Sequence, residues 1–222
     1  YEQRCDNAYI DTYAIHHPAE PSTSPRGVRM SPFYAEQEKL GAAFFDTSGW
    51  ERPRWFESNA GLLAGLNVPA RDAWSSKFWS PIAGAEHLKT REVAGIFDMT
   101  SLRRINVSGQ DAAKFLNYVA ARNVARGIGS VTYTMLLDHT GGIVSDVTIS
   151  QLAQDRFFIG GNSPRDVVWL KSISAGYEVQ IEDVTNGTTC IAVWGPQSRE
   201  ILTPITDTDL TNDTFKYFTA KE

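Results

Sequence analysis

The clearest pattern in the chain is an alternation of apolar and polar positions between residues 132 and 149, which predicts two strands joined by a turn. Residues 132–137 are rich in residues that favour strands. In residues 143–149, one set of alternate positions holds Ile, Ser, Val and Ile, and the other holds Val, Asp and Thr. The segment between them ends in two glycines, which reach the positive φ angles of tight turns without steric cost. Because Asp is depleted in strands, Asp146 is either exposed to solvent or has a functional role at this position.

The length of the turn decides whether Tyr133 faces Asp146. A four-residue loop places Leu137 opposite Gly142 and Tyr133 opposite Asp146. A five-residue loop shifts the pairing and puts the two side chains on opposite faces, and a glycine bulge would restore the first arrangement. An aromatic ring beside a carboxylate suits a flat, cationic or proton-bearing ligand. The pattern leaves an alternative open, in which Asp146 is an exposed acid on the solvent-facing side of a hairpin.

The rest of the pattern predicts an α+β fold with a largely antiparallel sheet and packed helices, because hairpins interrupt the alternation of strands and helices. Further helices are expected at residues 85–94, 110–121 and 196–202, and from residue 164, where Ser163 is the expected N-cap. Further strands are expected at residues 97–107, 156–161, 177–184 and 188–194, and from residue 214 to 219.

Residues 1–80 are expected to form an irregular, aromatic-rich extension. Several prolines within residues 1–35 remove backbone donors and restrain the residues before them, which favours irregular backbone there. A short helix is expected at residues 31–40, capped by Ser31 and ended by Gly41. Four tryptophans fall in the second half of the extension and must pack against other groups; they are Trp50, Trp55, Trp74 and Trp79.

Composition narrows the classes of partner. The chain has 222 residues, 42% of them hydrophobic and 21% charged, which is enough for a sizeable core. Its net charge of −5 and the lack of a basic stripe argue against a nucleic-acid partner. No run of apolar residues is long enough for a membrane span, and no signal-peptide pattern opens the chain, so we expect neither a membrane partner nor secretion. Both ends look cut, and we expect a piece of a longer protein.

The sequence contains no pattern for a metal or a dinucleotide. Cys5 and Cys190 are too far apart in sequence to suggest a metal motif or a disulfide framework. The four histidines have no partners at metal-ligand spacing; they are His16, His17, His87 and His139. No G-x-G-x-x-G follows a strand, so we expect no FAD site within this chain.

Several motifs, taken in order, resemble the aminomethyltransferase family, the T-protein of the glycine cleavage system. They are Arg91 to Asp98, Gly129-x-x-x-Tyr133-Thr, Gly141-Gly142-Ile, Ser145-Asp146, Gly160-Gly-Asn162 and Trp194-Gly195-Pro196-Gln-Ser-Arg199. The resemblance covers roughly residues 80–205. It implies that residues 81–222 are the N-terminal part of a T-protein-like folate-binding domain, with tetrahydrofolate as its cofactor.

The extension resembles a narrower group within this family. Residues 13–18, 29–34, 41–45 and 49–53 are similar to the central region of dimethylglycine and sarcosine dehydrogenases or oxidases, in which an FAD domain precedes this region. The pair Ser145-Asp146 also fits that branch. The resemblance implies an FAD domain in the same polypeptide but outside this chain, a small N-methyl amine as substrate, and a location in the bacterial cytoplasm or the mitochondrial matrix.

The resemblance also implies roles for particular residues. Asp146 would be catalytic, beside the reactive nitrogens of tetrahydrofolate, where a carboxylate can hold the pteridine or assist proton transfer. Tyr133 would stack on the pterin, Asn162 would pair with its edge, and Leu102 would form an apolar wall. Ordinary structural roles stay open: Tyr133 as a sheet-facing aromatic residue, and Asn162 as a residue of a strand end or helix cap.

The implied function is the folate-binding part of a flavin-dependent N-methyl amine dehydrogenase or oxidase, which passes a one-carbon unit to tetrahydrofolate. Two alternatives remain: a non-catalytic regulatory or assembly subunit of the same architecture, and a stand-alone aminomethyltransferase. The family's later folate-gripping glutamate and arginine would fall beyond Glu222, so we expect weak folate affinity and no activity from this piece alone.

Overall fold

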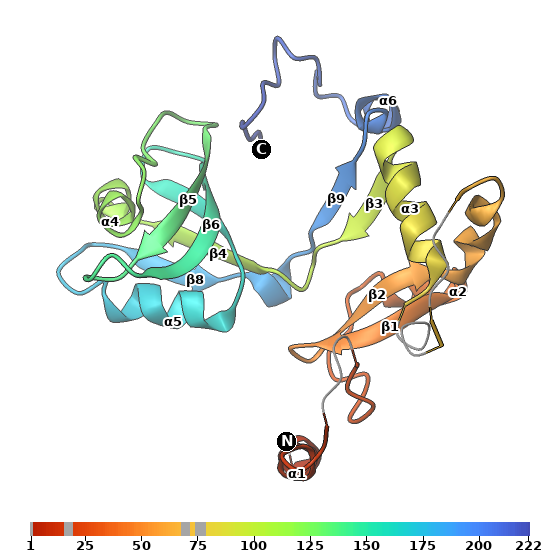
Figure 1. Ribbon diagram of the computed structural model, residues 1–222. Coiled ribbons are helices and arrows are strands. Elements are labelled where there is room, and N and C mark those ends of the chain that lie inside the picture. The colour runs from red at the N-terminus through yellow and green to blue at the C-terminus, as the bar shows by residue number, and fades with distance from the viewer. Residues whose placement is uncertain (1, 16–19, 68–71, 74–78) are drawn as a thin grey trace. The chain divides into compact units, whose positions relative to one another are not determined.

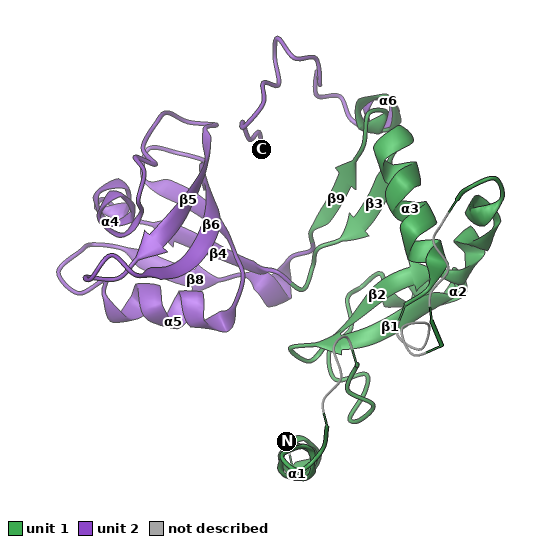
Figure 2. Ribbon diagram, viewed as in Figure 1, with its two compact units in different colours: residues 1–101, 190–201 green, residues 102–189, 202–222 purple. Residues whose placement is uncertain are grey.

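The computed structural model describes residues 2–15, 20–67, 72–73 and 79–222. His16, His17 and Trp74, named above, lie outside these ranges. The chain forms two compact units (Figure 2). The first comprises residues 1–101 and 190–201, and the second comprises residues 102–189 and 202–222.

The second unit contains a five-stranded antiparallel sheet with the order β5-β6-β7-β4-β8 (Figure 1). Its strands are β4 (Arg103–Ser108), β5 (Val131–Leu137), β6 (Ile143–Gln151), β7 (Arg156–Gly161) and β8 (Gln180–Asp183). The two long helices of this unit are α4 (Ala112–Val119) and α5 (Pro164–Ser172), and η3 (Thr185–Gly187) is a short 3₁₀ helix. The expected α+β class with an antiparallel sheet is confirmed.

One face of this sheet packs against α4 and α5 in a single core. Phe115 and Leu116 of α4 and Leu170 of α5 are fully buried in the same cluster as the inward-facing residues of the strands. Those strand residues are Ile105, Val107, Leu136, Val147, Ile149, Phe157, Ile159 and Ile181. Because side chains alternate along a strand, the remaining positions form the opposite face of the sheet, which we call the outer face.

The predicted hairpin is confirmed, but its register differs from both simple alternatives. Tyr133 lies opposite Thr148, and Met135 lies opposite Asp146. The register shifts between Leu136 and Leu137, which leaves Val144 as an extra residue in β6. The turn therefore has the five residues 138–142, and a bulge at Val144 rather than at a glycine restores the shared face. Tyr133 and Asp146 are diagonal neighbours and not directly opposite each other.

Two expected strands are wrong. The segment 97–107 is not one strand, because it divides into β3 (Gly95–Asp98) and β4, which belong to different sheets. The break is stabilised by Asp98, whose Oδ1 accepts a hydrogen bond of 3.0 Å from the Thr100 N–H. Near the end of the chain, Thr219 makes only an isolated bridge to Ser130 instead of starting a strand.

The first unit contains two small antiparallel ribbons, β1-β2 and β3-β9. Its elements are α1 (Glu2–Asp11), α2 (Tyr34–Lys39), β1 (Ala42–Thr47), β2 (Trp50–Phe56), the 3₁₀ helix η1 (Glu57–Leu63), α3 (Pro81–Glu92), β3, β9 (Ile191–Trp194) and most of α6 (Ser198–Leu202). A further 3₁₀ helix, η4 (Thr203–Ile205), follows α6 in the second unit. In the described part of the chain, no helix is long and apolar enough to cross a membrane.

The irregular backbone expected throughout residues 1–35 is wrong for Glu2–Asp11, which form α1. This segment contains no proline, so every residue in it keeps the N–H that a helix requires. The helix expected at residues 31–40 is confirmed in shorter form as α2, but the expected cap at Ser31 is wrong, because the N-cap is Phe33 and has no side-chain cap hydrogen bond. The Ser31 hydroxyl accepts a hydrogen bond of 3.2 Å from the Phe33 N–H just before α2, and Gly41 follows the helix with φ of +71°.

Candidate functional site

Three of the four residues proposed from the sequence come together on the outer face. The Tyr133 hydroxyl donates to Asp146 Oδ2 at 3.0 Å. The Asn162 side-chain amide donates to Asp146 Oδ1 at 3.0 Å and to the Asp146 carbonyl oxygen at 2.7 Å. Asp146 lies in β6, Tyr133 lies in the neighbouring strand β5, and Asn162 directly follows β7, the neighbour of β6 on the other side. The carboxylate is thus held by two donors while it remains on the exposed side of the sheet.

Tyr133 is 41% exposed, although its hydroxyl is engaged. Its hydrogen bond to Asp146 raises the pKa of the phenol above 10.0, because ionisation would remove the donated proton and place a second negative charge beside the carboxylate. Partial desolvation acts in the same direction. Tyr133 is therefore a protonated hydrogen-bond donor at neutral pH, with an accessible ring.

Asn162 is held through its backbone as well as its side chain. Its N–H donates to Oδ2 of Asp166 at 2.8 Å, and the same oxygen accepts from the Ser163 N–H at 3.0 Å. Ser163 caps α5 by accepting a hydrogen bond of 3.0 Å from the Arg165 N–H, so Ser163 and Asp166 form a capping box. The predicted N-cap at Ser163 is confirmed.

Leu102, the fourth predicted site residue, lies at the same end of the sheet as Asn162. It is half-buried and directly precedes Arg103, which pairs with Gly161. Since Asn162 directly follows Gly161, the antiparallel register brings Leu102 and Asn162 to the same end of the β4–β7 pair. The Leu102 carbonyl oxygen accepts a hydrogen bond of 2.9 Å from Arg104 Nη1.

Arg103 and Arg104, which follow Leu102, are both buried. Arg103 forms an ion pair of 3.0 Å with Asp183 at the end of β8. The Arg104 guanidinium donates to the carbonyl oxygens of Thr185 and Thr188 at 2.8 and 3.0 Å. Arg103 therefore fastens β4 to the end of β8, and Arg104 fastens β4 to the segment that follows β8.

Thr148 and Gly160 belong to the outer face beside these residues, and no role was predicted for them. They are paired across β6 and β7, and Thr148 is in turn opposite Tyr133. A Cβ atom on Gly160 would lie 2.7 Å from Thr148 Oγ1, so the position has no room for a side chain in this arrangement. A glycine inside a strand often marks a close approach of another group, and this signal was available in the sequence.

The donor and acceptor set suits a flat ligand with polar edges. Asp146 offers a carboxylate, Asn162 offers an amide, and Tyr133 offers a ring face. These groups fit a reduced pterin, whose pyrimidine ring is flat and whose edge presents N–H groups and a carbonyl. Among the described residues no group of three or more His, Cys, Asp or Glu is arranged to hold a metal ion.

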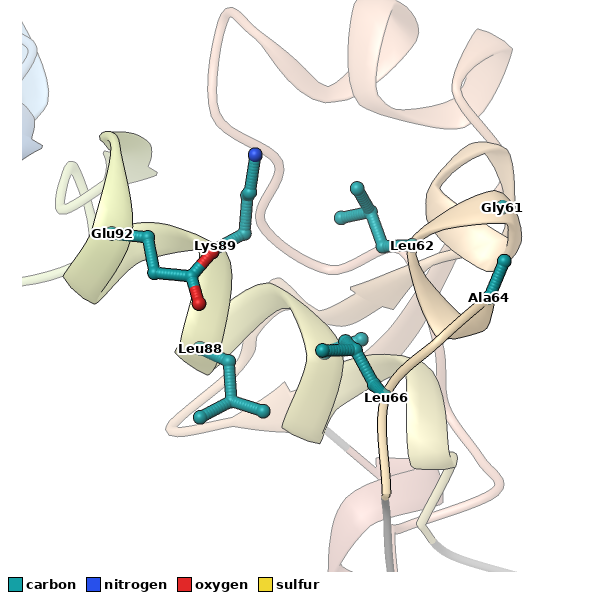
Figure 3. Close-up of a pocket in the computed structure, with 8 residues that line it drawn as sticks. Gly61, Leu62, Ala64, Leu66, Leu88, Lys89 and Glu92 are labelled. Atoms are coloured by element: carbon teal, nitrogen blue, oxygen red, sulfur yellow. The ribbon is translucent and has the colours of Figure 1, made fainter.

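A separate hollow of about 250 Å³ lies in the first unit, between η1 and α3 (Figure 3). Leu62 and Leu66 line one side, and Leu88, Lys89 and Glu92 line the α3 side. Its lining contains none of the four predicted site residues. The candidate site is therefore the outer-face cluster of Tyr133, Asp146 and Asn162.

Comparison with known families gives one match over most of the chain. The family described as the GCVT N-terminal domain matches residues 33–222. A solved structure of the glycine cleavage system aminomethyltransferase T from Bartonella henselae superposes with a TM-score of 0.65 and 28% sequence identity. The match covers 80% of this chain and 44% of that protein.

Three of the similar curated proteins represent two kinds of enzyme, a transferase and amine oxidoreductases. The aminomethyltransferase of Herpetosiphon aurantiacus is 29% identical over 85% of this chain and 46% of its own length. The 4-methylaminobutanoate oxidase (formaldehyde-forming) of Paenarthrobacter nicotinovorans is 29% identical over 92% of this chain and 25% of its own length. The mitochondrial dimethylglycine dehydrogenase of Homo sapiens is 25% identical over 99% of this chain and 25% of its own length. The chain thus spans between a quarter and about half of these relatives.

Proposed function

The chain belongs to the GCVT N-terminal domain family, and from that premise we propose that its outer-face cluster binds a reduced folate during one-carbon transfer. The observation that supports this most strongly is the arrangement of Tyr133, Asp146 and Asn162. Tyr133 of β5 and Asn162, which directly follows β7, both donate to the carboxylate of Asp146 in β6. The two side-chain donors hold this carboxylate on the exposed side of the sheet, beside the accessible ring of Tyr133.

Each residue has a chemical task in this proposal. The Asp146 carboxylate accepts N–H groups from the ligand edge and stabilises positive charge that develops next to it, which a charge-assisted hydrogen bond does more strongly than a neutral one. Tyr133 keeps its proton, holds the carboxylate in position and offers its ring to the pterin. Asn162 fixes the other carboxylate oxygen, and Leu102 supplies an apolar wall. The bound folate supplies the nucleophilic nitrogens that accept the one-carbon unit.

We further propose that the chain is part of a flavin-dependent enzyme that demethylates a small N-methyl amine. The alignments support this branch, because the oxidase and the dehydrogenase match 92% and 99% of the chain, whereas the aminomethyltransferase matches 85%. In this proposal residues 1–80 belong to a central region, and residues 81–222 to a folate domain. FAD binds to another domain of the same polypeptide, in the bacterial cytoplasm or the mitochondrial matrix.

A stand-alone aminomethyltransferase is the second candidate. It is favoured by the superposition on the aminomethyltransferase T structure and by the aminomethyltransferase relative. The two candidates share the folate site and differ in whether an FAD domain accompanies it. An FAD-binding fingerprint in the reading frame upstream of this chain is the outcome expected for the demethylating enzyme, and its absence there supports the transferase.

Isothermal titration of the chain with 5-formyltetrahydrofolate, a stable reduced folate, tests the shared claim. We expect saturable binding of millimolar to micromolar strength, and no binding of FAD in a parallel titration. Failure of the folate to bind at millimolar concentration, or binding of FAD by this chain, contradicts the proposal.

A further inference from the structure

We propose that Asp166 is a positioning residue that holds Asn162 against Asp146, an inference that rests on the proposed folate site. Asp166 is only 3% exposed and lies in the first turn of α5. One of its carboxylate oxygens accepts the backbone N–H groups of both Asn162 and Ser163, at 2.8 and 3.0 Å. These two bonds fix the turn that joins β7 to α5.

A continuous series of hydrogen bonds connects this buried carboxylate to the exposed one. Asp166 holds the backbone of Asn162, and the Asn162 side chain reaches Asp146 at 2.7 Å for the carbonyl oxygen and 3.0 Å for Oδ1. Hydrogen bonds weaken steeply once distance or angle departs from these values. If the Asn162 backbone were released, its amide would no longer be aimed at Asp146, and the carboxylate would lose one of its two side-chain donors.

Gly161 provides a second observation that points to the same role. A Cβ atom on Gly161 would lie 2.8 Å from Oδ2 of Asp166, closer than real Cβ contacts. The carboxylate thus occupies the space that a side chain at residue 161 would need. The absence of a side chain at Gly161 therefore lets the buried acid reach the backbone N–H of Asn162, the residue that holds Asp146.

Asp166 also belongs to the capping box of α5, so the test must separate helix stability from positioning. Ser163 forms the other half of the box, through its hydroxyl and the Arg165 N–H at 3.0 Å. Replacing Ser163 by Ala removes that bond and leaves the bond between Asp166 and the Asn162 N–H in place. Ser163→Ala is therefore the matched control, since it weakens the same helix start without releasing Asn162.

The first measurement requires no ligand. In ¹H–¹⁵N NMR spectra of the full chain, the side-chain amide signals of Asn162 report its hydrogen bonds to Asp146. We expect Asp166→Ala to shift or broaden these signals and Ser163→Ala to leave them in place. Unchanged Asn162 signals in Asp166→Ala would overturn the proposal. If that variant does not fold, Asp166→Leu, which keeps the branched shape of the side chain and removes both acceptor oxygens, takes its place with the same expected shift.

The second measurement is a double-mutant cycle on the affinity for 5-formyltetrahydrofolate. We expect Asp166→Ala to weaken binding about tenfold in the wild-type background and less than about twofold in an Asn162→Ala background, because it acts through Asn162. Equal weakening in both backgrounds would overturn the proposal. If the wild-type chain binds no folate, the proposed function fails, and the NMR measurement still decides whether Asp166 positions Asn162.

Discussion

Tyr133 and Asp146 are hydrogen-bonded at 3.0 Å although they are not paired across the hairpin that contains them. Tyr133 is paired with Thr148, two residues further along β6, and the phenol reaches Asp146 diagonally. Diagonal neighbours on one face of a sheet are within reach of long aromatic side chains. The long tyrosine side chain therefore connects the edge strand β5 to the acid of β6 and leaves the position opposite Asp146 to Met135.

This relationship predicts a titration that can be followed without any ligand. The bond to Asp146 raises the pKa of Tyr133 above 10.0, since the phenolate would lose the bond and repel the carboxylate. Asp146→Asn removes the negative charge, and we expect the pKa of Tyr133 to fall toward 10.0. The measurement is a pH titration of ¹³C-labelled tyrosine by NMR, with Tyr133→Phe to assign the signal and Asp155→Asn as a charge-matched control. A pKa that does not change in Asp146→Asn would show that the bond is not formed in solution.

The close packing of Gly160 against Thr148 predicts non-additive stability. We expect Gly160→Ala to destabilise the protein by about 1 kcal/mol, because its Cβ would lie 2.7 Å from Thr148 Oγ1. In a Thr148→Ala background the clash disappears, and the same change should stabilise the protein by about 0.5 kcal/mol, because Ala costs less backbone entropy than Gly. Urea unfolding of the four proteins measures the coupling. Equal effects of Gly160→Ala in both backgrounds would contradict this packing.

An acid-labile contact is predicted in the first unit. Glu51 in β2 is 5% exposed, and it accepts hydrogen bonds from the Arg26 guanidinium and, at 2.7 Å, from the Gly27 N–H. The bond with Arg26 lowers the pKa of Glu51 below 4.5, against the opposing effect of burial. Because the folded pKa is below the unfolded one, the stabilisation is fully present above pH 4.5 and is lost as the pH falls through the lowered pKa.

Glu51→Gln should therefore cost about 1–2 kcal/mol of unfolding free energy at pH 7 and make stability less dependent on pH in the acid range. Urea unfolding between pH 3 and 7, followed by tryptophan fluorescence, measures both effects. The exposed acid Glu92 offers a matched control as Glu92→Gln. A variant that loses stability with falling pH as steeply as the wild type would contradict this role of Glu51.

Local rules in the sequence predicted those features that depend on neighbouring residues. Ser163-Pro164-Arg-Asp166 marked the start of α5, because an N-cap, a proline in the first turn and a capping-box acid act within four positions. The alternation in β6 likewise placed Asp146 on the face opposite the core, where the structure has it. The resemblance to the aminomethyltransferase family added Asn162, whose approach to Asp146 no local pattern predicts.

Features that depend on distant contacts could not be predicted from the local pattern. The chain leaves the strand direction after Asp98, and this acid is bound by Ser31 and Gln37, more than 60 positions earlier in the sequence. The register of the central hairpin depends on a bulge at Val144, which the turn composition does not specify. The position of Asn162 between two carboxylates likewise has no local signal: its backbone N–H is bonded to Asp166, and its side chain is bonded to Asp146.

The most direct test of the proposed site is an NMR titration of the chain with 5-formyltetrahydrofolate, as wild type, Asp146→Asn and Asp155→Asn. Asp155 is an exposed acid at the opposite end of the β6–β7 hairpin, so its replacement removes the same charge away from the site. We predict saturable shifts at Tyr133, Asp146 and Asn162, with affinity reduced at least about tenfold by Asp146→Asn and less than about twofold by Asp155→Asn. Shifts that avoid these residues, or equal affinity of wild type and Asp146→Asn, would contradict a folate site on this face of the sheet.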